Sequence, residues 1–398
     1  MNSKSRQEDR MSRNTSPTPP ASEARGSGKE ARQRRTDIAL LIHDLPFGGA
    51  ERCCITLASK LVDAGLRVQV LTAQANGEWL SEIPDGAEHI NLDAPRPLSL
   101  LRSLYKYFRR TPPRSVLAFM ETVGCIAILA RLLSGADSRT VVSIRVLLSR
   151  HLRNELSASR LFKRIWTARL LLPHADAISA VSNVVARDAE GLFWLKTAFV
   201  SVVSNPVLPS RRAEVGHSPA HPWMNDGQPE KLVISAGRMV DQKDHLTLLE
   251  AFDRLTRVRK SRLIIFGDGP LRNRLLEKVA SLRLGDRVDL PGVADLSSAF
   301  PFADLFVLTS RYEGSPNALL EAIAAGCPVV STNWEGAEEI LPPVVEDSLA
   351  PIGDAPEICR AMMHALDQGD ELAVRQRNGI RNNNVDESVA AYRSLLRV

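Results

Sequence analysis

The sequence predicts an α/β protein made of two doubly wound parallel-sheet domains that face each other across a cleft. Short apolar runs recur along the chain with helical segments between them, which is typical of parallel sheets covered by helices. The runs form two sets on either side of residues 206–230, a polar stretch with five prolines that favours a linker. A length of 398 residues is sufficient for two domains of ordinary size.

Each predicted strand is a short apolar run bounded by polar or turn-forming residues. The first set comprises residues 38–43, 68–73, 115–120, 140–145, 177–182 and 199–203. The second set comprises residues 232–236, 262–266, 287–290, 305–309 and 328–332. Because ligands of such sheets bind outside the carboxyl ends of the strands, we expect the functional residues in the loops that follow them.

These patterns divide the chain into five segments. We expect a disordered basic tail (1–35), a first sheet domain (36–205), the linker (206–230), a second sheet domain (231–375) and a C-terminal segment (376–398). The last segment ends in a helical pattern with one apolar face, formed by Val385, Val389, Tyr392 and Leu396.

The N-terminal tail carries the whole charge excess of the chain. It holds nine Lys or Arg and four Asp or Glu, which gives it a net charge of +5, the same as the formal net charge of the full chain. Almost no apolar residue occurs in the tail, so burial cannot offset the entropy of ordering it and we expect disorder. Aromatic residues do not interleave with its basic ones, so we expect no nucleic-acid partner.

Composition also limits location and chemistry. No apolar run reaches the length of a membrane span, and the N-terminus lacks the apolar core of a signal peptide. The five cysteines show no metal-ligand spacing, which favours a reducing, cytoplasmic compartment and predicts no metal site. We expect no bound cofactor.

Glu313 and Glu321 flank the start of a predicted helix that follows the strand at 305–309. Ser315 is a good N-cap and Pro316 suits the first helical position. The first-turn N–H groups would then lack intrahelical partners, and the helix dipole would favour an anion beside them. These groups belong to Asn317, Ala318 and Leu319. One carboxylate before this anion site and one behind it suit a ligand that has both phosphate and hydroxyl groups.

Two further loops carry candidate groups for a phosphate. Gly48 and Gly49 follow the first predicted strand, where glycine lets backbone approach a phosphate; a tight turn that needs glycine is the alternative explanation. Arg238 and Lys243 follow the first strand of the second set, and their charges could neutralise a departing diphosphate. The alternative is a pair of solvated surface charges.

These runs together resemble the retaining glycosyltransferases of family 4, which share the two-Rossmann-domain GT-B fold. The E-x7-E run matches at Glu313, Gly314, Pro316, Asn317, Leu319, Glu321 and Ala322. The G-G-A-E-R loop matches at Gly48, Gly49, Ala50, Glu51 and Arg52, and the family's Arg and Lys match at Arg238 and Lys243. The resemblance extends from about residue 37 onward.

The resemblance implies roles for these positions. Glu313 would contact the donor sugar, Glu321 the ribose, and Arg238 and Lys243 the pyrophosphate of a UDP-, GDP- or similar sugar. The family also places backbone near Val293 against the base, and Glu339 matches its G-G-x-x-E-i run with Glu335 in place of a glycine. The N-terminal domain would bind the acceptor.

One position departs from the family pattern. Many members carry a histidine where this chain has Arg145, at the end of a predicted strand. A catalytic histidine is therefore not transferable, and Arg145 is either a contact for the sugar or acceptor or a surface residue at a strand end.

The resemblance predicts a retaining, metal-independent transfer of a hexose or N-acetylhexosamine to a glycan or lipid-linked glycan, as in surface polysaccharide or glycoconjugate synthesis. A GT-B nucleotide-sugar 2-epimerase and a non-catalytic nucleotide-sugar-binding protein remain alternatives. Two basic amphipathic stretches, residues 95–114 and 149–173, would suit an anionic membrane surface, such as the inner face of the cytoplasmic membrane, or would be packed helices with a solvated basic face.

Overall fold

The computed structural model describes residues 35–155, 157–196, 199–206, 220–225, 227, 229–341, 343–379 and 385–398. The expected disorder of the tail concerns residues 1–34 and so lies outside the described residues, as does most of the expected linker. Residues 220–225 do not act as linker, because Met224 is buried in the core of the second sheet and the His221 ring lies 2.8 Å from Asp289.

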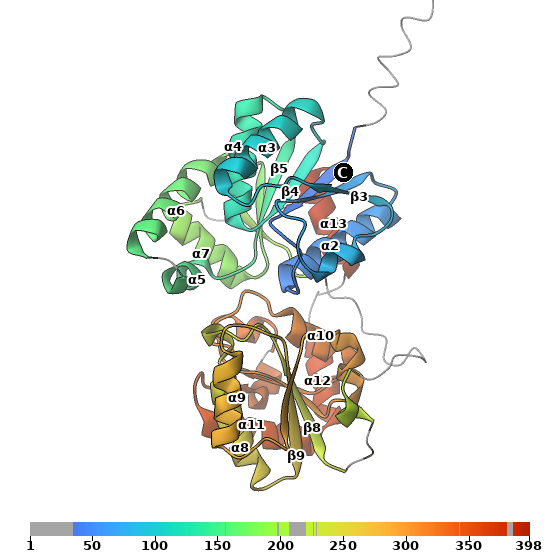
Figure 1. Ribbon diagram of the computed structural model, residues 1–398, viewed down its shortest axis with the longest axis vertical. Coiled ribbons are helices and arrows are strands. Elements are labelled where there is room, and N and C mark those ends of the chain that lie inside the picture. The colour runs from blue at the N-terminus through green and yellow to red at the C-terminus, as the bar shows by residue number, and fades with distance from the viewer. Residues whose placement is uncertain are drawn as a thin grey trace, which may run out of the picture. The chain divides into compact units, whose positions relative to one another are not determined.

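The first sheet has seven parallel strands with helices on both faces (Figure 1). Its strands are β1 (Ile38–Ile42), β2 (Val68–Thr72), β3 (Ala87–Asn91), β4 (Ser115–Phe119), β5 (Arg139–Ile144), β6 (Ala177–Ala180) and β7 (Val200–Val202). The helices are α2 (Gly49–Asp63), α3 (Pro97–Arg110), α4 (Glu121–Ser134), α5 (Leu148–Glu155), α6 (Ala158–Leu171) and α7 (Asn183–Phe193).

The second sheet has six parallel strands. They are β8 (Lys231–Ala236), β9 (Ser261–Phe266), β10 (Val288–Gly292), β11 (Leu305–Leu308), β12 (Val329–Thr332) and β13 (Leu349–Ala350). The helices that follow β8 in the chain are α8 (His245–Thr256), α9 (Arg272–Ser281), α10 (Asn317–Ala325), α11 (Ala355–Gln368), α12 (Asp370–Gly379) and α13 (Val385–Leu396). These sheets confirm the prediction of two doubly wound parallel-sheet domains.

Strand order reverses once in each sheet. The first sheet runs β3-β2-β1-β4-β5-β6-β7 and the second runs β10-β9-β8-β11-β12-β13. The order therefore changes direction between β1 and β4 and again between β8 and β11. Loops diverge at such a point and leave a crevice at the carboxyl ends of the two strands, where ligands of this fold class bind. The candidate site lies in the loops that follow β1, β8 and β11.

Alternating side chains divide the first core between the two faces of its sheet. Ile38, Leu40 and Ile42 of β1 pack with α2, whereas Ala39 and Leu41 pack with α3 and α4. This alternation is the period of two expected of a strand. Because both faces are covered by helices, the central strands are fully apolar, which is why their sequences were recognisable.

Two edge strands were absent from the predictions. β3 has the burial pattern of a largely exposed strand, and β13 has only two residues. A strand that pairs on one side only and faces solvent needs no apolar run, so composition does not reveal it. The main-chain ladder with β2, in register from Val68 opposite Ala87, holds β3 in the sheet.

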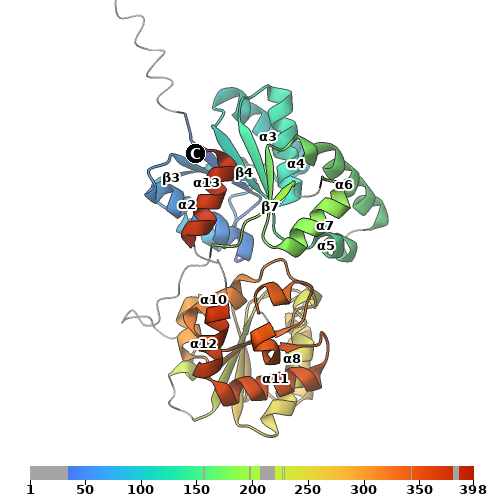
Figure 2. The ribbon, with the colours of Figure 1, turned by 180° about the vertical axis from the view of Figure 1, so that it is seen from behind.

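The final helix, α13, packs on the first sheet (Figure 2). Its apolar face, Val385, Val389, Tyr392 and Leu396, is buried in the same cluster as β1 and α2. The expected segment boundary at residue 376 was wrong, because Gln376 lies inside α12 and exchanges two hydrogen bonds with the backbone of Val329 in β12. Only the later of these two helices belongs to the first core.

Among the described residues, no helix combines the length and the apolar character that crossing a bilayer requires.

Candidate active site

Two loops meet at the point where the strand order of the second sheet reverses. The loop after β8 contains Gln242 and Lys243, and the loop after β11 runs from Thr309 into α10. The Thr309 hydroxyl donates to the carbonyl of Lys243 (3.0 Å), and the Gln242 amide donates to the carbonyl of Tyr312 (2.8 Å). These bonds bring together two sequence runs that are 70 residues apart.

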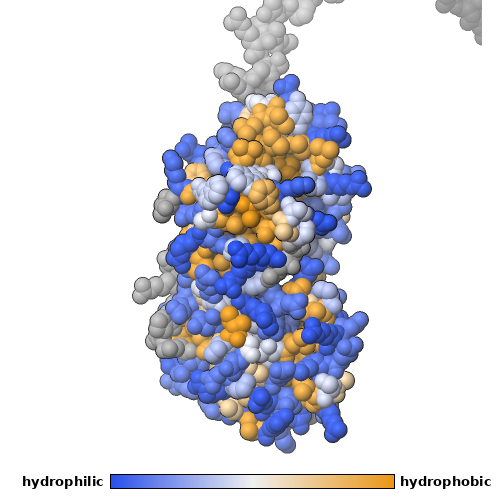
Figure 3. Space-filling view, turned by 90° about the vertical axis from the view of Figure 1, so that its left-hand side faces the viewer, coloured by the Kyte–Doolittle hydropathy of each residue, from blue (hydrophilic) through white to orange (hydrophobic). Residues whose placement is uncertain are grey.

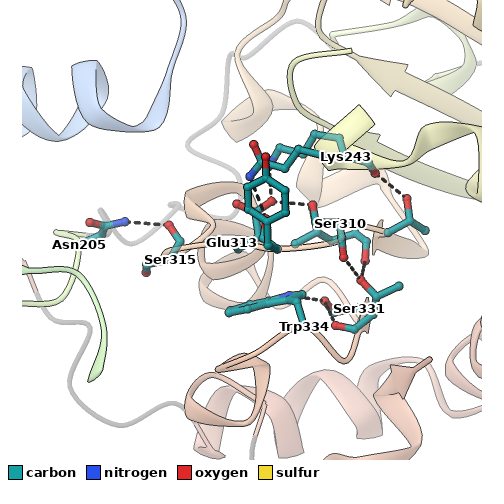
Figure 4. A network of polar contacts seen from close by, with 12 residues as sticks. Asn205, Lys243, Ser310, Glu313, Ser315, Ser331 and Trp334 are labelled. Atoms are coloured by element: carbon teal, nitrogen blue, oxygen red, sulfur yellow. Dashed lines mark hydrogen bonds and ion pairs between the residues drawn. The ribbon is translucent and has the colours of Figure 1, made fainter. Parts of the chain in front are cut away.

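Glu313 is held between two donors at this junction (Figure 4). Its Oε1 accepts a hydrogen bond from the Lys243 ammonium at 2.6 Å and another from the Ser310 hydroxyl at 2.6 Å. The carboxylate is buried, so the ion pair with Lys243 offsets the cost of removing its charge from water. An ammonium has three donors, and Lys243 therefore retains capacity for a phosphate oxygen while it holds Glu313.

Arg238 lies in the loop after β8 with Lys243, but no acidic side chain among the described residues pairs with it. Its side chain is exposed and makes no ion pair or hydrogen bond with any other described residue. The loop backbone is fixed by the next turn, because the N–H of Met239 donates to Asp268 and the N–H of Leu271 donates back to Met239. A guanidinium can form charge-assisted hydrogen bonds with a dianionic ligand.

Helix α10 begins one residue later than predicted. Pro316 is the N-cap residue and Asn317 the first helical one, so Ser315 does not cap the helix. The first bond of the helix joins the N–H of Leu320 to the carbonyl of Pro316 at 3.2 Å. The three N–H groups before it, those of Asn317, Ala318 and Leu319, have no partner in the helix, as predicted. The side chain of Leu319 itself is buried in the second core.

Asn205 joins this helix end to the first sheet domain, and sequence analysis did not identify it. Its amide donates to the carbonyl of Ser315 (3.0 Å, Figure 4) and to Oδ1 of Asn317 (2.5 Å). Its own Oδ1 accepts from Arg145 at 2.6 Å. Asn205 lies 112 residues before Asn317, and nothing local marks it as a site residue.

Glu321 pairs with Arg52 in the first turn of α2. Arg52 Nη1 lies 2.8 Å from Oε2 of Glu321, across 269 residues of sequence. Burial raises the pKa of Glu321 to about 7; the Arg52 guanidinium opposes this and Asp295 adds to it. Glu321 therefore changes protonation near neutral pH, and its second carboxylate oxygen remains available for a hydroxyl group.

Neither Gly48 nor Gly49 has a backbone conformation that favours glycine, but both lie close to the ends of other side chains. Gly48 has an extended φ of −166°, which any residue adopts, so the explanation of a tight turn that needs glycine was wrong. A Cβ at Gly48 would lie 2.1 Å from a Glu51 carboxylate oxygen. A Cβ at Gly49 would lie 3.0 Å from the amide nitrogen of Asn317, which donates to the Gly49 carbonyl at 2.9 Å. The loop after β1 thus touches the end of α10.

Comparison with known families accounts for both sheet domains. The family described as "Glycosyltransferase Family 4" matches residues 47–211, and that described as "Glycosyl transferases group 1" matches residues 230–368. The chain belongs to the family 4 glycosyltransferases. The two matched regions include the loops that meet at this site.

Individual relatives of this glycosyltransferase are distant. An uncharacterized glycosyltransferase of Methanocaldococcus jannaschii is 38% identical over 115 residues, 28% of each chain. A Campylobacter jejuni N-acetylgalactosamine-N,N'-diacetylbacillosaminyl-diphospho-undecaprenol 4-alpha-N-acetylgalactosaminyltransferase is 27% identical over 76% of this chain and 82% of its own. The match therefore spans less than a third of the first relative and most of the second.

A solved structure supports the GT-B fold of this glycosyltransferase. Anabaena HepE, in complex with UDP and glucose, superposes with a TM-score of 0.74 at 18% sequence identity and covers 91% of this chain and all of its own. At this identity the likeness concerns the fold alone.

Arg145 is not the surface residue that one alternative proposed. It is buried at the end of β5, and its guanidinium lies over the Phe119 ring at 5.7 Å. One of its terminal nitrogens bonds Asn205, whereas the other, Nη1, has no hydrogen-bond partner in the described part of the chain. Its carbonyl lies against Gly314, where a Cβ would come within 2.2 Å of it. This glycosyltransferase therefore places Arg145 against the Glu313–Gly314 loop.

The remaining predicted residues lie further from Glu313. Val293 is exposed directly after β10, which leaves the neighbouring backbone accessible. Glu339 accepts hydrogen bonds from the backbone and side chain of Asn183, and Glu335 pairs with Arg150. Among the described residues, no cluster of three His, Cys, Asp or Glu side chains could hold a metal ion.

Proposed function

We propose that this glycosyltransferase is a retaining, metal-independent enzyme that uses a nucleoside diphosphate sugar. It would move a hexose or N-acetylhexosamine to a hydroxyl group of a glycan or lipid-linked glycan, in the cytoplasm and for surface polysaccharide or glycoconjugate synthesis. The observation that supports this most strongly is that the loop of Arg238 and Lys243 meets the loop that carries the buried Glu313 carboxylate and leads into α10.

Three positive groups suit a diphosphate leaving group. The free guanidinium of Arg238, the Lys243 ammonium and the unpartnered N–H groups of α10 all belong to loops at one end of the second sheet. Charges aimed at a developing anion lower the barrier to its departure. We assign these groups to the diphosphate, with no divalent cation needed to neutralise it.

The two carboxylates suit the two hydroxyl-bearing parts of the donor. Glu313, oriented by Lys243 and Ser310, would accept hydrogen bonds from the sugar. Glu321, which follows the first turn of α10, would accept hydrogen bonds from the ribose. Backbone near Val293 would lie against the base, and the Gly48–Gly49 loop would approach the donor phosphate and sugar.

The proposed reaction exchanges one C1–oxygen bond for another. The bond between C1 of the sugar and the diphosphate breaks, and its electron pair leaves on the diphosphate. The acceptor hydroxyl oxygen bonds to C1 on the same face, and its proton passes to the departing phosphate. Arg145, buried against the Glu313 loop with an unpartnered Nη1, would contact the sugar or the acceptor.

The relatives support the substrate classes of this proposal. The Campylobacter enzyme named above acts on a diphospho-undecaprenol-linked glycan, and the Anabaena protein holds UDP and glucose. Both are consistent with a nucleotide-sugar donor and a lipid-linked acceptor for this chain.

Transfer assays would test the proposal directly. We would screen UDP- and GDP-sugars for binding by calorimetry, then incubate the best donor with polyprenyl-diphosphate-linked glycans in EDTA. We expect a product whose anomeric configuration, measured by NMR, matches that of the donor. An inverted anomer, an activity that only added metal restores, or a donor epimer formed without acceptor would each contradict the proposal.

The pKa of Glu321 predicts a pH-dependent affinity for the nucleoside diphosphate. Because burial raises this pKa to about 7, Glu321 is protonated at lower pH in the protein without nucleotide. Hydroxyl groups that donate to Glu321 favour its ionised form. Affinity should therefore rise as the pH rises through 7 and fall by up to about tenfold per pH unit below it. The nucleotide titrates too, so the measurement is the difference between wild type and Glu321→Gln. Identical pH profiles would contradict the prediction.

A further inference from the structure

The two basic amphipathic stretches are different kinds of helix. In the first, now α3, the apolar residues Leu100, Leu104, Tyr107 and Phe108 are buried in the core, so this stretch is a packed helix with a solvated basic face. The second is divided between α5 and α6, and within α6 only Ala168 and Leu171 are buried. The large apolar side chains of α6 therefore need another explanation.

An exposed apolar patch covers the outer side of α6. Phe162, Trp166 and Leu170 are 62%, 45% and 70% exposed, and Trp194, directly after α7, is 66% exposed. We call these four residues the α6 patch. Its rings are in contact, with centroid distances of 5.8 Å between Phe162 and Trp166 and 5.5 Å between Trp166 and Trp194. Soluble surfaces seldom leave several large apolar residues adjacent and uncovered.

Hydrophobic side chains also gather on this side of the first sheet domain in the space-filling view. Figure 3 looks at the side on which Figure 1 labels α6, and it shows orange groups there with blue ones among them. The mixture of the two is what a surface at a lipid interface requires.

Only positive charges accompany the patch on its own helix. Within Ala158–Leu171 there are four basic residues and no acidic one. Lys163 follows Phe162 directly, and the Arg169 guanidinium stacks on Trp194 at 3.4 Å from the ring centroid. Because helix neighbours lie three and four residues apart, Phe162, Trp166 and Leu170 form one stripe with Lys163 and Arg169 beside it. Aromatic residues beside Lys and Arg are typical of the headgroup region of a bilayer.

We propose that the α6 patch docks this protein on a bilayer that contains anionic phospholipids. Phe162, Trp166, Leu170 and Trp194 enter the boundary between headgroups and acyl chains, and the basic residues of α6 bind lipid phosphates. This is attachment to the surface of the bilayer, driven by apolar burial and charge together.

A second copy of the chain fits the patch less well. A two-fold dimer through this surface would place each α6 against the same helix of its partner. Three basic residues of one helix, Arg160, Lys163 and Arg169, would then oppose the same three of the other, with no acid on either helix to pair them. The fourth, Arg164, is already paired with Glu121. Like charges at an interface oppose association, whereas anionic lipid neutralises all of them.

The docked helix is tied to the end of the first sheet. Arg164, on α6, forms an ion pair with the fully buried Glu121, and its Nε donates to Oε1 of that carboxylate at 2.6 Å. Glu121 begins α4 directly after β4, at the carboxyl edge of the sheet. Docking through α6 would therefore present this edge to an acceptor held in the bilayer; this last step rests on the proposed function.

Vesicle flotation tests the docking surface. The full chain is mixed with vesicles of phosphatidylcholine alone or of phosphatidylcholine and phosphatidylglycerol. We expect wild type to float with the anionic vesicles only, less so at high salt. Phe162→Gln/Leu170→Gln should lower the partition coefficient at least about tenfold, because two large apolar side chains no longer enter the bilayer. Lys163→Gln should weaken only the part of vesicle binding that depends on anionic lipid.

Matched controls separate the patch from general hydrophobicity. Val258→Gln changes a residue as exposed as Leu170 but on the second sheet domain, and Leu98→Gln changes an exposed residue of α3. Both should float like wild type. Failure of wild type to float, or normal flotation of the double variant, would overturn the inference. So would a dimer, seen by sedimentation velocity, that the double variant dissociates.

A nucleotide titration distinguishes this inference from the proposed function. The double variant should bind the nucleoside diphosphate as wild type does, since its substitutions are not in the loops of the site. Nucleotide binding without flotation contradicts the docking surface alone. Flotation without any nucleotide-sugar binding contradicts the proposed function alone.

Discussion

Replacing Arg238 or Lys243 by alanine should lower turnover at least roughly a hundredfold, as the loss of one donor to a developing oxyanion does in other enzymes. Each variant removes a positive charge from the diphosphate at the moment when its own charge increases. Steady-state kinetics with saturating donor would measure the effect, and near-normal turnover in both variants would exclude the proposed clamp.

The two variants differ in what else they disturb. Lys243→Ala also leaves the buried Glu313 without its ion pair, so a fall in melting temperature should accompany the loss of activity. Arg238 has no partner among the described residues, so Arg238→Ala should keep the wild-type melting temperature. Arg274→Ala, another exposed arginine on the second sheet domain, is the matched control and should retain full turnover.

Substitutions of Glu313 and Glu321 should have different effects on nucleotide affinity and turnover, because the two residues bind different parts of the proposed donor. Glu321→Gln should weaken affinity for the free nucleoside diphosphate roughly tenfold to a hundredfold, because a hydroxyl–carboxylate hydrogen bond contributes about 1.5–3 kcal/mol. Glu313→Gln should leave that affinity almost unchanged while it lowers turnover, since the product nucleotide has no sugar for it to contact. Isothermal titration of both variants with the nucleotide would measure this.

Arg52→Gln is the control that the structure adds. It breaks the ion pair with Glu321, and because the guanidinium opposes the raised pKa of Glu321, the comparison is made well above pH 7, where the carboxylate stays ionised. If Arg52→Gln lost as much affinity as Glu321→Gln, the ion pair and not the ribose contact would explain the effect. Loss of nucleotide binding in Glu313→Gln, with none in Glu321→Gln, would reverse the two proposed roles.

Local signals in the sequence revealed the parts of the fold that are buried on both sides. Ile38–Ile42 and Leu305–Leu308 are unbroken apolar runs because helices cover both faces of their sheets. The loops with Gly48 and Glu313 were recognisable because a glycine pair or a carboxylate stands directly after such a run. β3 was not, because main-chain hydrogen bonds, which any residue provides, hold it at the edge of the sheet.

The sequence by itself determined the two sheets, the order of their strands along the chain, and the residue types that each loop delivers. Tertiary structure decided which of those residues meet. The pairing of Lys243 with Glu313 depends on the reversal of strand order in the second sheet, which brings the loops after β8 and β11 together. The pairing of Arg52 with Glu321 and the role of Asn205 depend on contacts between residues of the two sheet domains. It also decided that α3 buries its apolar face and α6 does not, because periodicity records an apolar stripe but not whether another helix covers it.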